Sequence, residues 1–141
     1  MSGIELGFTE DISAEDMARL IRAALGGLPL IVRLPLARAA ELGQAAARAG
    51  ADALTIGAPP RISIQVGERT VTGRLYSPDN FPTALEAVRA VQDVGLPLIG
   101  AGGVYSPENA QAMLEAGAVA VQVDAALWSD PGGLVNQLAA L

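Results

Sequence analysis

Two hydrophobic periodicities alternate along the chain. Short apolar runs predict strands at residues 4–6, 30–34, 53–56, 96–99 and 118–123. The segments between most of these runs repeat apolar residues every three or four positions, as amphipathic helices do. Strands that alternate with helices predict a parallel sheet with right-handed crossovers. The pattern therefore indicates an α/β fold of about five βα units.

Local signals predict where several helices begin and end. Ser13 and Ser106 are each suited to cap a helix N-terminus, and Pro107 suits the first helical position. A last helix is expected to open at Pro131 and to end at Leu141. Glycines predict three helix C-termini, at Gly26–Gly27, Gly50 and Gly117. A length of 141 residues favours one domain over residues 1–141.

Residues 61–73 interrupt this rhythm. Apolar and polar residues alternate over 61–66 and again over 70–72, and Gly67-Glu68 between them can form a turn. This pattern predicts an inserted β-hairpin, with an irregular surface loop as the alternative. The order of elements fits two architectures, an open doubly wound sheet and part of a (β/α)₈ barrel.

Composition excludes several kinds of chemistry. The chain has no cysteine, histidine or lysine, so it offers no thiol, imidazole or Schiff-base lysine, and no metal site is expected. Its formal net charge of −6 argues against nucleic acid as a partner. No apolar run approaches the roughly 20 residues of a membrane span, and no signal peptide is evident. We therefore expect a cytoplasmic protein.

The strongest candidate site is the glycine loop Gly100-Ala101-Gly102-Gly103, which directly follows a predicted strand. Glycine lets backbone amides approach an anion, although a tight turn that needs positive φ explains the loop equally well. The next strand ends near Asp124, and a short helical turn is expected at 125–128. Barrels of this type often bind phosphate between their last two loops, beside such a helix. A phosphate-bearing small molecule is therefore a candidate ligand.

The same segments resemble dihydroorotate dehydrogenases. Leu96–Ala110 is similar to the seventh βα unit of that family, and Gly117–Leu127 to the eighth. Gly73–Pro78 resembles the segment before helix six, and Pro29–Leu34 resembles strand five. The resemblance implies a partial TIM barrel, equivalent to strands four to eight. It also implies an FMN-dependent oxidoreductase of pyrimidine biosynthesis that takes hydride from a dihydropyrimidine.

The resemblance also implies a set of cofactor-binding residues. They are Arg33, Gly73, Gly102, Gly103, Asp124 and Ala125. Gly102 and Gly103 would donate backbone amides to the FMN phosphate. Asp124 and Ala125 stand where the family has Gly-Thr or Gly-Ser, and Arg33 replaces a lysine near the flavin ring. Gly73 would border the flavin.

Other positions depart from the family pattern. Gly7–Glu10 replaces an Asn-rich segment that contains cysteine, and Gly57–Pro60 lacks the polar residues that contact substrate in the family. The catalytic base has no counterpart, so the catalytic residues are unknown. The alternative function is a non-catalytic half-barrel that binds a phosphate-bearing ligand or serves as a structural, oligomerising domain. Arg33, in an apolar strand, must be paired or face a ligand, and Trp128 is expected to be a packing anchor.

Half a barrel leaves two open strand edges and an uncovered sheet face. The equivalents of strands one to three are absent from this sequence. We therefore expect a homodimer, or pairing with a missing N-terminal half.

Overall fold

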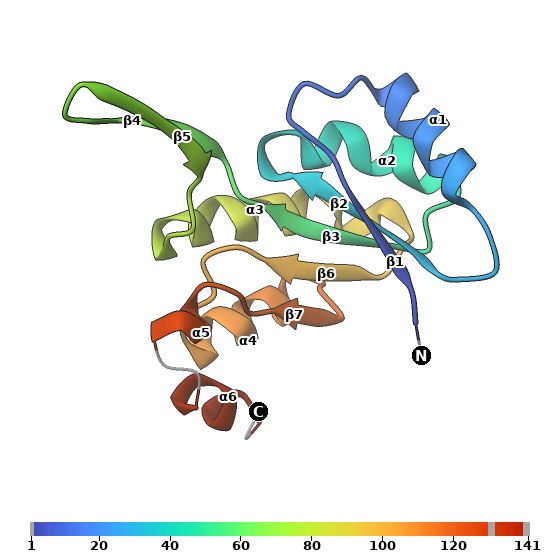
Figure 1. Cartoon of the computed structure of the whole chain (residues 1–141). Coiled ribbons are helices and arrows are strands. Elements are labelled where there is room, and N and C mark those ends of the chain that lie inside the picture. The colour runs from blue at the N-terminus through green and yellow to red at the C-terminus, as the bar shows by residue number, and fades with distance from the viewer. Residues whose placement is uncertain (1, 130–131, 140–141) are drawn as a thin grey trace.

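The computed structural model describes residues 2–129 and 132–139. Its main sheet has five parallel strands in the order β1-β2-β3-β6-β7 (Figure 1). These strands are β1 Ile4–Gly7, β2 Leu30–Pro35, β3 Ala53–Ala58, β6 Leu98–Ala101 and β7 Ala120–Gln122. Because each new strand joins the same edge, the order never reverses. A doubly wound sheet requires such a reversal, so the partial barrel is confirmed and the open doubly wound alternative is wrong.

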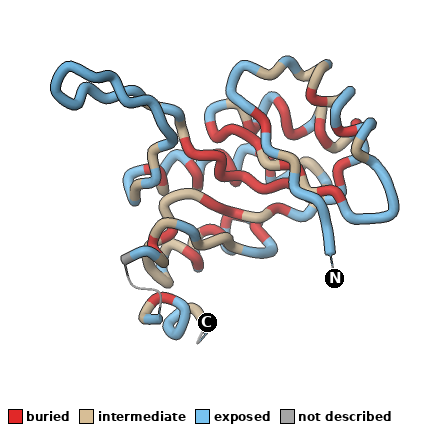
Figure 2. Tube along the Cα trace, in the orientation of Figure 1, coloured by how far each residue is buried: buried red, intermediate tan, exposed pale blue. Residues whose placement is uncertain are grey.

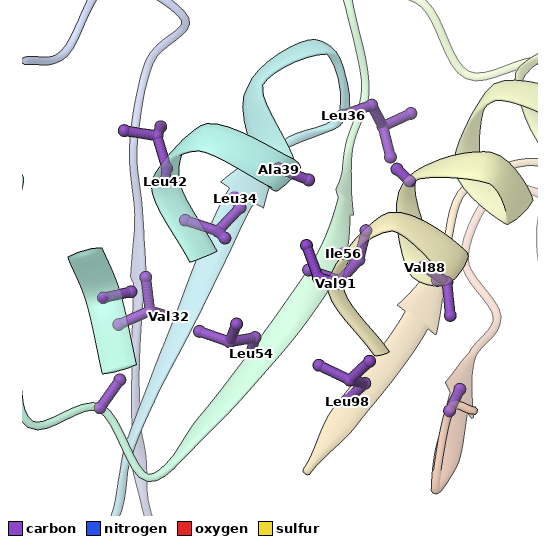
Figure 3. Packing of buried hydrophobic residues seen from close by; sticks show 14 of the residues in the cluster. Val32, Leu34, Leu36, Ala39, Leu42, Leu54, Ile56, Val88, Val91 and Leu98 are labelled. Carbon is purple, nitrogen blue, oxygen red and sulfur yellow. The ribbon is translucent and has the colours of Figure 1, made fainter. Parts of the chain in front are cut away.

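Helices connect the strands and pack on one face of the sheet. They are α1 Ala14–Ala24, α2 Ala39–Ala49, α3 Phe81–Val91, α4 Pro107–Glu115, α5 Ala126–Ser129 and α6 Gly133–Leu138, with 3₁₀ turns at Leu36–Arg38, Pro78–Asn80 and Gln92–Val94. In Figure 3, Ile56 of β3 and Leu98 of β6 lie near Val91 of α3, and Leu54 of β3 lies between α2 and α3, in the cluster that also includes Val88. All five of these side chains are buried. This apolar layer between strands and helices is the main core of the domain.

The predicted helix N-caps are confirmed. The Asp16 amide donates to Ser13 Oγ at 3.0 Å, and the Asn109 amide donates to Ser106 Oγ at 3.3 Å. Gly50 and Gly117 follow their helices with φ of 104° and 107°, as the sequence predicts. The first helix differs, because it ends at Ala24 and leaves through Leu25 in an extended conformation. Gly26 and Gly27 therefore lie in the following loop, and neither supplies a left-handed cap.

The inserted β-hairpin is also confirmed, as β4 Arg61–Val66 and β5 Arg69–Arg74. It projects away from the body and is almost entirely exposed (Figures 1 and 2). Because side chains alternate along a strand, one face carries Ile64, Val66 and Val71, each slightly more than half exposed. The other face is polar and is tied by a hydrogen bond between Ser63 and Thr72. The hairpin is thus amphipathic, with its apolar face in solvent.

The C-terminal part departs from expectation in two respects. Trp128 lies in α5 as expected, but its 88% exposure shows that the packing-anchor interpretation is wrong. The expected helix start at Pro131 and its end at Leu141 lie outside the described residues. Helix α6 itself packs against α4, and its Leu134 is buried. Within the described chain, no helix has the length and apolar character needed to cross a membrane.

Candidate functional site

Four polar residues form a hydrogen-bonded network on the sheet face opposite the helices. Arg33 of β2 donates from Nε and Nη2 to Glu5 Oε2 of β1, at 3.1 and 2.8 Å. Thr55 Oγ1 of β3 donates to Glu5 Oε1 at 2.7 Å, and Arg33 Nη2 also donates to Gln122 Oε1 of β7 at 2.9 Å. Thr55 is fully buried, and the Arg33 side chain is 21% exposed. The arginine is therefore paired, as a largely buried guanidinium requires.

The contact between Arg33 and Gln122 shows that the sheet is curved. Their strands, β2 and β7, are separated by β3 and β6. Adjacent strands lie about 4.8 Å apart, so β2 and β7 would be about 14 Å apart in a flat sheet. Side chains stand roughly perpendicular to a sheet, so these two would not meet across a flat one. The sheet must therefore curl around this face, as a barrel wall does around its interior.

A pocket opens at the carboxyl ends of the strands, next to this network. Arg33 and Gln122 form part of its wall. The ends of β3 and β6, together with the segments after β3, after the hairpin, after β6 and after β7, supply the rest: Gly57, Pro59, Tyr76, Ser77, Asn80, Ala101, Gly102, Gly103, Val104, Tyr105, Asp124 and Ala125. This end of the strands is where ligands bind in α/β barrels. The pocket is therefore the candidate functional site.

The structure brings together all but one of the candidate cofactor-binding residues. Arg33, Gly102, Gly103, Asp124 and Ala125 line this pocket. Gly73 does not, because it lies on exposed β5 opposite Ile62, where an added Cβ would meet no other residue within 4 Å.

Sequence reasoning missed several lining residues, among them Ser77 and Asn80. The Asn80 side chain is nearly buried and donates through Nδ2 to the Leu75 carbonyl at 2.7 Å, which holds the segment after the hairpin in place. This segment packs beside the glycine loop only in the folded chain.

The glycine loop is needed for packing as well as for any ligand. Gly102 and Gly103 have φ of 99° and 70°, in the left-handed region that favours glycine. A Cβ on Gly103 would lie 2.4 Å from the backbone nitrogen of Phe81, the first residue of α3. Gly57 is equally confined, since its Cβ would lie 2.3 Å from that of Ala101. The tight-turn explanation of this loop is therefore confirmed, and the ligand explanation stays a prediction.

The N-terminus of α4 already has a negative partner. Hydrogen bonds from the Ser106 hydroxyl and from its own backbone amide hold the pKa of the Glu108 carboxyl below its usual value. Asn109 Oδ1 accepts the Tyr105 amide at 3.1 Å. Helix N-termini attract anions through free amides and the helix dipole, and here Ser106 caps one amide while Glu108 adds a negative charge to the first turn. An anion in the pocket therefore depends on the glycine loop and on side chains.

Among the described residues, two charged side chains line the pocket, those of Arg33 and Asp124. Arg33 is paired with Glu5, which lies just behind the pocket wall. Asp124 is exposed at the end of β7, and its backbone carbonyl accepts the Leu127 amide at 3.0 Å as α5 begins. Among the residues that the structure describes, no hydrogen bond or ion pair engages its carboxylate. The pocket thus contains the guanidinium of Arg33, which is paired with Glu5, and the carboxylate of Asp124, which has no ion-pair partner among the described residues.

The segment after β1, which departs most from the family pattern, is held by Arg38. Arg38 Nη1 donates to the carbonyls of Glu10 and Ile12, at 2.8 and 2.5 Å, and its other nitrogens pair with Glu41. The hydrogen bond with Glu41 raises the pKa of Arg38, and the same bond lowers the pKa of Glu41. The loop is therefore fixed by main-chain contacts. Its Thr9 and Glu10 line a second groove near the hairpin base, with Arg61 and Arg74 opposite.

Comparison with known proteins decides the family. The family model for dihydroorotate dehydrogenase matches residues 29–138. The chain belongs to the dihydroorotate dehydrogenase family. It is 36% identical over 138 residues to dihydroorotate dehydrogenase A (fumarate) of Limosilactobacillus reuteri, an alignment that covers 92% of this chain and 44% of that protein. It is 37% identical, also over 138 residues, to the catalytic subunit of dihydroorotate dehydrogenase B (NAD(+)) of Geobacter sp., covering 92% and 45%. The chain thus spans less than half the length of these relatives.

The fold comparison agrees with the family. The crystal structure of the Eimeria tenella dihydroorotate dehydrogenase in complex with ferulenol matches with a TM-score of 0.64. The match covers 80% of this chain and 33% of that one, at 20% sequence identity. At this identity the likeness establishes the fold alone. A partial barrel is expected to match only part of a longer barrel protein, as this five-stranded sheet does.

The chemistry of the pocket lining suits a flavin in part. Two glycines with positive φ, one arginine and several hydroxyl and amide side chains line it, which suits the polar tail and ring edges of FMN. The carboxylate of Asp124 opposes the phosphate group by charge. Within residues 2–129 and 132–139, no group of acidic side chains is arranged to hold a metal ion.

Proposed function

We propose that this chain forms the FMN-binding side of a dihydroorotate dehydrogenase-type flavoprotein. One observation carries the proposal: Arg33, Gly102, Gly103 and Ala125, from three separate parts of the chain, line one pocket at the carboxyl ends of the strands. Membership of the family supplies the cofactor class. Bound FMN would supply the redox chemistry by accepting hydride.

The residues of the chain would bind and orient the cofactor. The amides of Gly102 and Gly103 face the phosphate end in this proposal, and Arg33 lies toward the ring. Arg33 is held in place from two sides, by Glu5 and Gln122, so its guanidinium is oriented before any ligand arrives. Such preorganisation lowers the cost of binding.

No residue is assigned as the catalytic base. The segments after β1 and β3 carry Gly7–Glu10 and Gly57–Pro60, and the chain contains no cysteine. A second candidate function therefore stands beside the first, a half-barrel that binds the cofactor or another phosphate-bearing ligand without turnover.

Titration of the purified chain with FMN tests the proposal. We expect quenching of flavin fluorescence on binding, and about tenfold weaker binding by Arg33→Met, the typical effect of losing a charged contact. Arg69→Met, on the exposed hairpin, is the matched control and should bind as the original chain does. Absence of FMN binding would refute the proposal. Binding without oxidation of dihydroorotate would favour the non-catalytic alternative.

We further propose that the chain associates with a second copy of itself. Both sheet edges, β1 and β7, are open within the described fold, and the apolar hairpin face is in solvent. An isolated two-stranded hairpin is marginal in water, so a partner that covers this face would stabilise it. We expect a dimer mass by sedimentation equilibrium and a shift toward monomer for Val71→Lys, but not for Thr72→Lys on the polar face. A monomeric original chain would refute self-association.

A further inference from the structure

We infer that Asp124 makes this pocket nearly indifferent to the phosphate of its flavin, so that riboflavin and FMN bind with similar affinity. The inference rests on the proposed flavin site and adds a specificity-determining residue to it. It follows from the charges that surround the glycine loop.

The pocket offers little positive charge to a phosphate group. Of the pocket-lining residues that the structure describes, Arg33 alone carries a cationic side chain. Two of its nitrogens donate to one oxygen of Glu5, and Nη2 is also shared with Gln122. A phosphate that recruited this guanidinium would have to compete with a carboxylate already 2.8 Å away. Arg33 therefore adds little net attraction for a dianion.

Helix α4, which follows the glycine loop, adds little attraction for a phosphate group. In many phosphate sites the N-terminus of such a helix adds attraction. Here the Ser106 hydroxyl oxygen accepts the Asn109 amide at 3.3 Å, and Glu108 places a carboxylate in the first turn, so the end of α4 already has a cap and a negative charge. The loop amides remain as phosphate donors without a helix terminus behind them.

The carboxylate of Asp124 opposes a phosphate group in this pocket. It lines the same pocket as Gly102 and Gly103, and no described residue neutralises its carboxylate. Next to it, Ala125 has no hydroxyl group to offer a phosphate. An unpaired carboxylate within about 6 Å of a phosphate dianion opposes binding by roughly tenfold at the high effective dielectric of an exposed site. This repulsion offsets the hydrogen bonds that the loop amides would donate.

The same residues favour a hydroxylated chain. A carboxylate accepts hydrogen bonds from hydroxyl groups, and Ser77, Asn80 and Gln122 in the wall can donate or accept. The ribityl hydroxyls that riboflavin and FMN share therefore find partners whether or not the phosphate is present. Affinity should follow the shared part of the two ligands.

The test compares riboflavin and FMN on the full chain by fluorescence titration, in the original protein and in Asp124→Asn. We expect dissociation constants within about threefold of each other for the original chain. In Asp124→Asn, FMN should bind about tenfold more tightly, while riboflavin should change by less than about twofold. Asp124→Glu, which keeps the charge, should behave as the original. Asp93→Asn removes a charge from an exposed turn outside the pocket wall and controls for net charge.

The outcomes separate this inference from the function on which it rests. If the original chain prefers FMN by more than tenfold and Asp124→Asn leaves that preference unchanged, the role of Asp124 is refuted while flavin binding stands. If neither flavin binds to any variant, the proposed function and this inference fail together.

Discussion

Replacing Gly103 with alanine should destabilise the chain by about 3–5 kcal/mol, a large part of the stability of a typical domain. The added Cβ would lie 2.4 Å from the backbone nitrogen and 2.8 Å from the Cα of Phe81. These are backbone atoms at the start of α3, which cannot move without shifting the helix. Alanine at φ of 70° adds its own strain. Urea unfolding followed by circular dichroism measures the loss.

Gly26→Ala is the matched control for this substitution. Gly26 lies in the loop after α1 with no positive φ, and a Cβ there would meet no described residue within 4 Å. Its free energy of unfolding should change by less than about 0.5 kcal/mol. If Gly103→Ala were as stable as Gly26→Ala, the close approach of the glycine loop to α3 would be wrong.

Leu54→Ala should cost about 2–5 kcal/mol, the range for a buried leucine that leaves a cavity. Leu54 of β3 is fully buried at the centre of the sheet, between β2 and β6 (Figure 3). Both neighbouring strands and the helices α2 and α3 contribute to the same cluster, so the surroundings cannot easily collapse into the space. Chemical denaturation measures the effect.

Leu28→Ala provides the comparison. Leu28 lies before β2 and is 47% exposed, so its truncation should cost under about 1 kcal/mol. Equal losses in Leu54→Ala and Leu28→Ala would mean that the layer between strands and helices is not the core described above.

Much of the fold could be predicted because its signals are local. The alternation of strands and helices, the caps at Ser13 and Ser106, and the turn at Gly67 each depend on a few neighbouring residues. The choice between an open sheet and a barrel depends on strand order. That order is a long-range property, and only the resemblance in residues 96–127 indicated it before the structure did.

The polar network was harder to predict, because its members are far apart in the chain. Glu5, Arg33, Thr55 and Gln122 each stand between two apolar residues of a strand segment, and this repeated placement is the signal that could have revealed a shared inward face. Pairing partners do not follow from that pattern. The exposure of Trp128 was missed for a related reason, since residue type alone does not tell which side of a short helix meets the core.

The contact between Arg33 and Gln122 also bears on how a longer barrel would be assembled. The hydrogen bond between Arg33 of β2 and Gln122 of β7 joins two strands of this curved sheet. The sheet is therefore curved without the strands that would close a ring. Further strands would then add to an edge that already has the correct inclination. In such an assembly, the C-terminal arc would form first, and the remaining strands would pair with its edges.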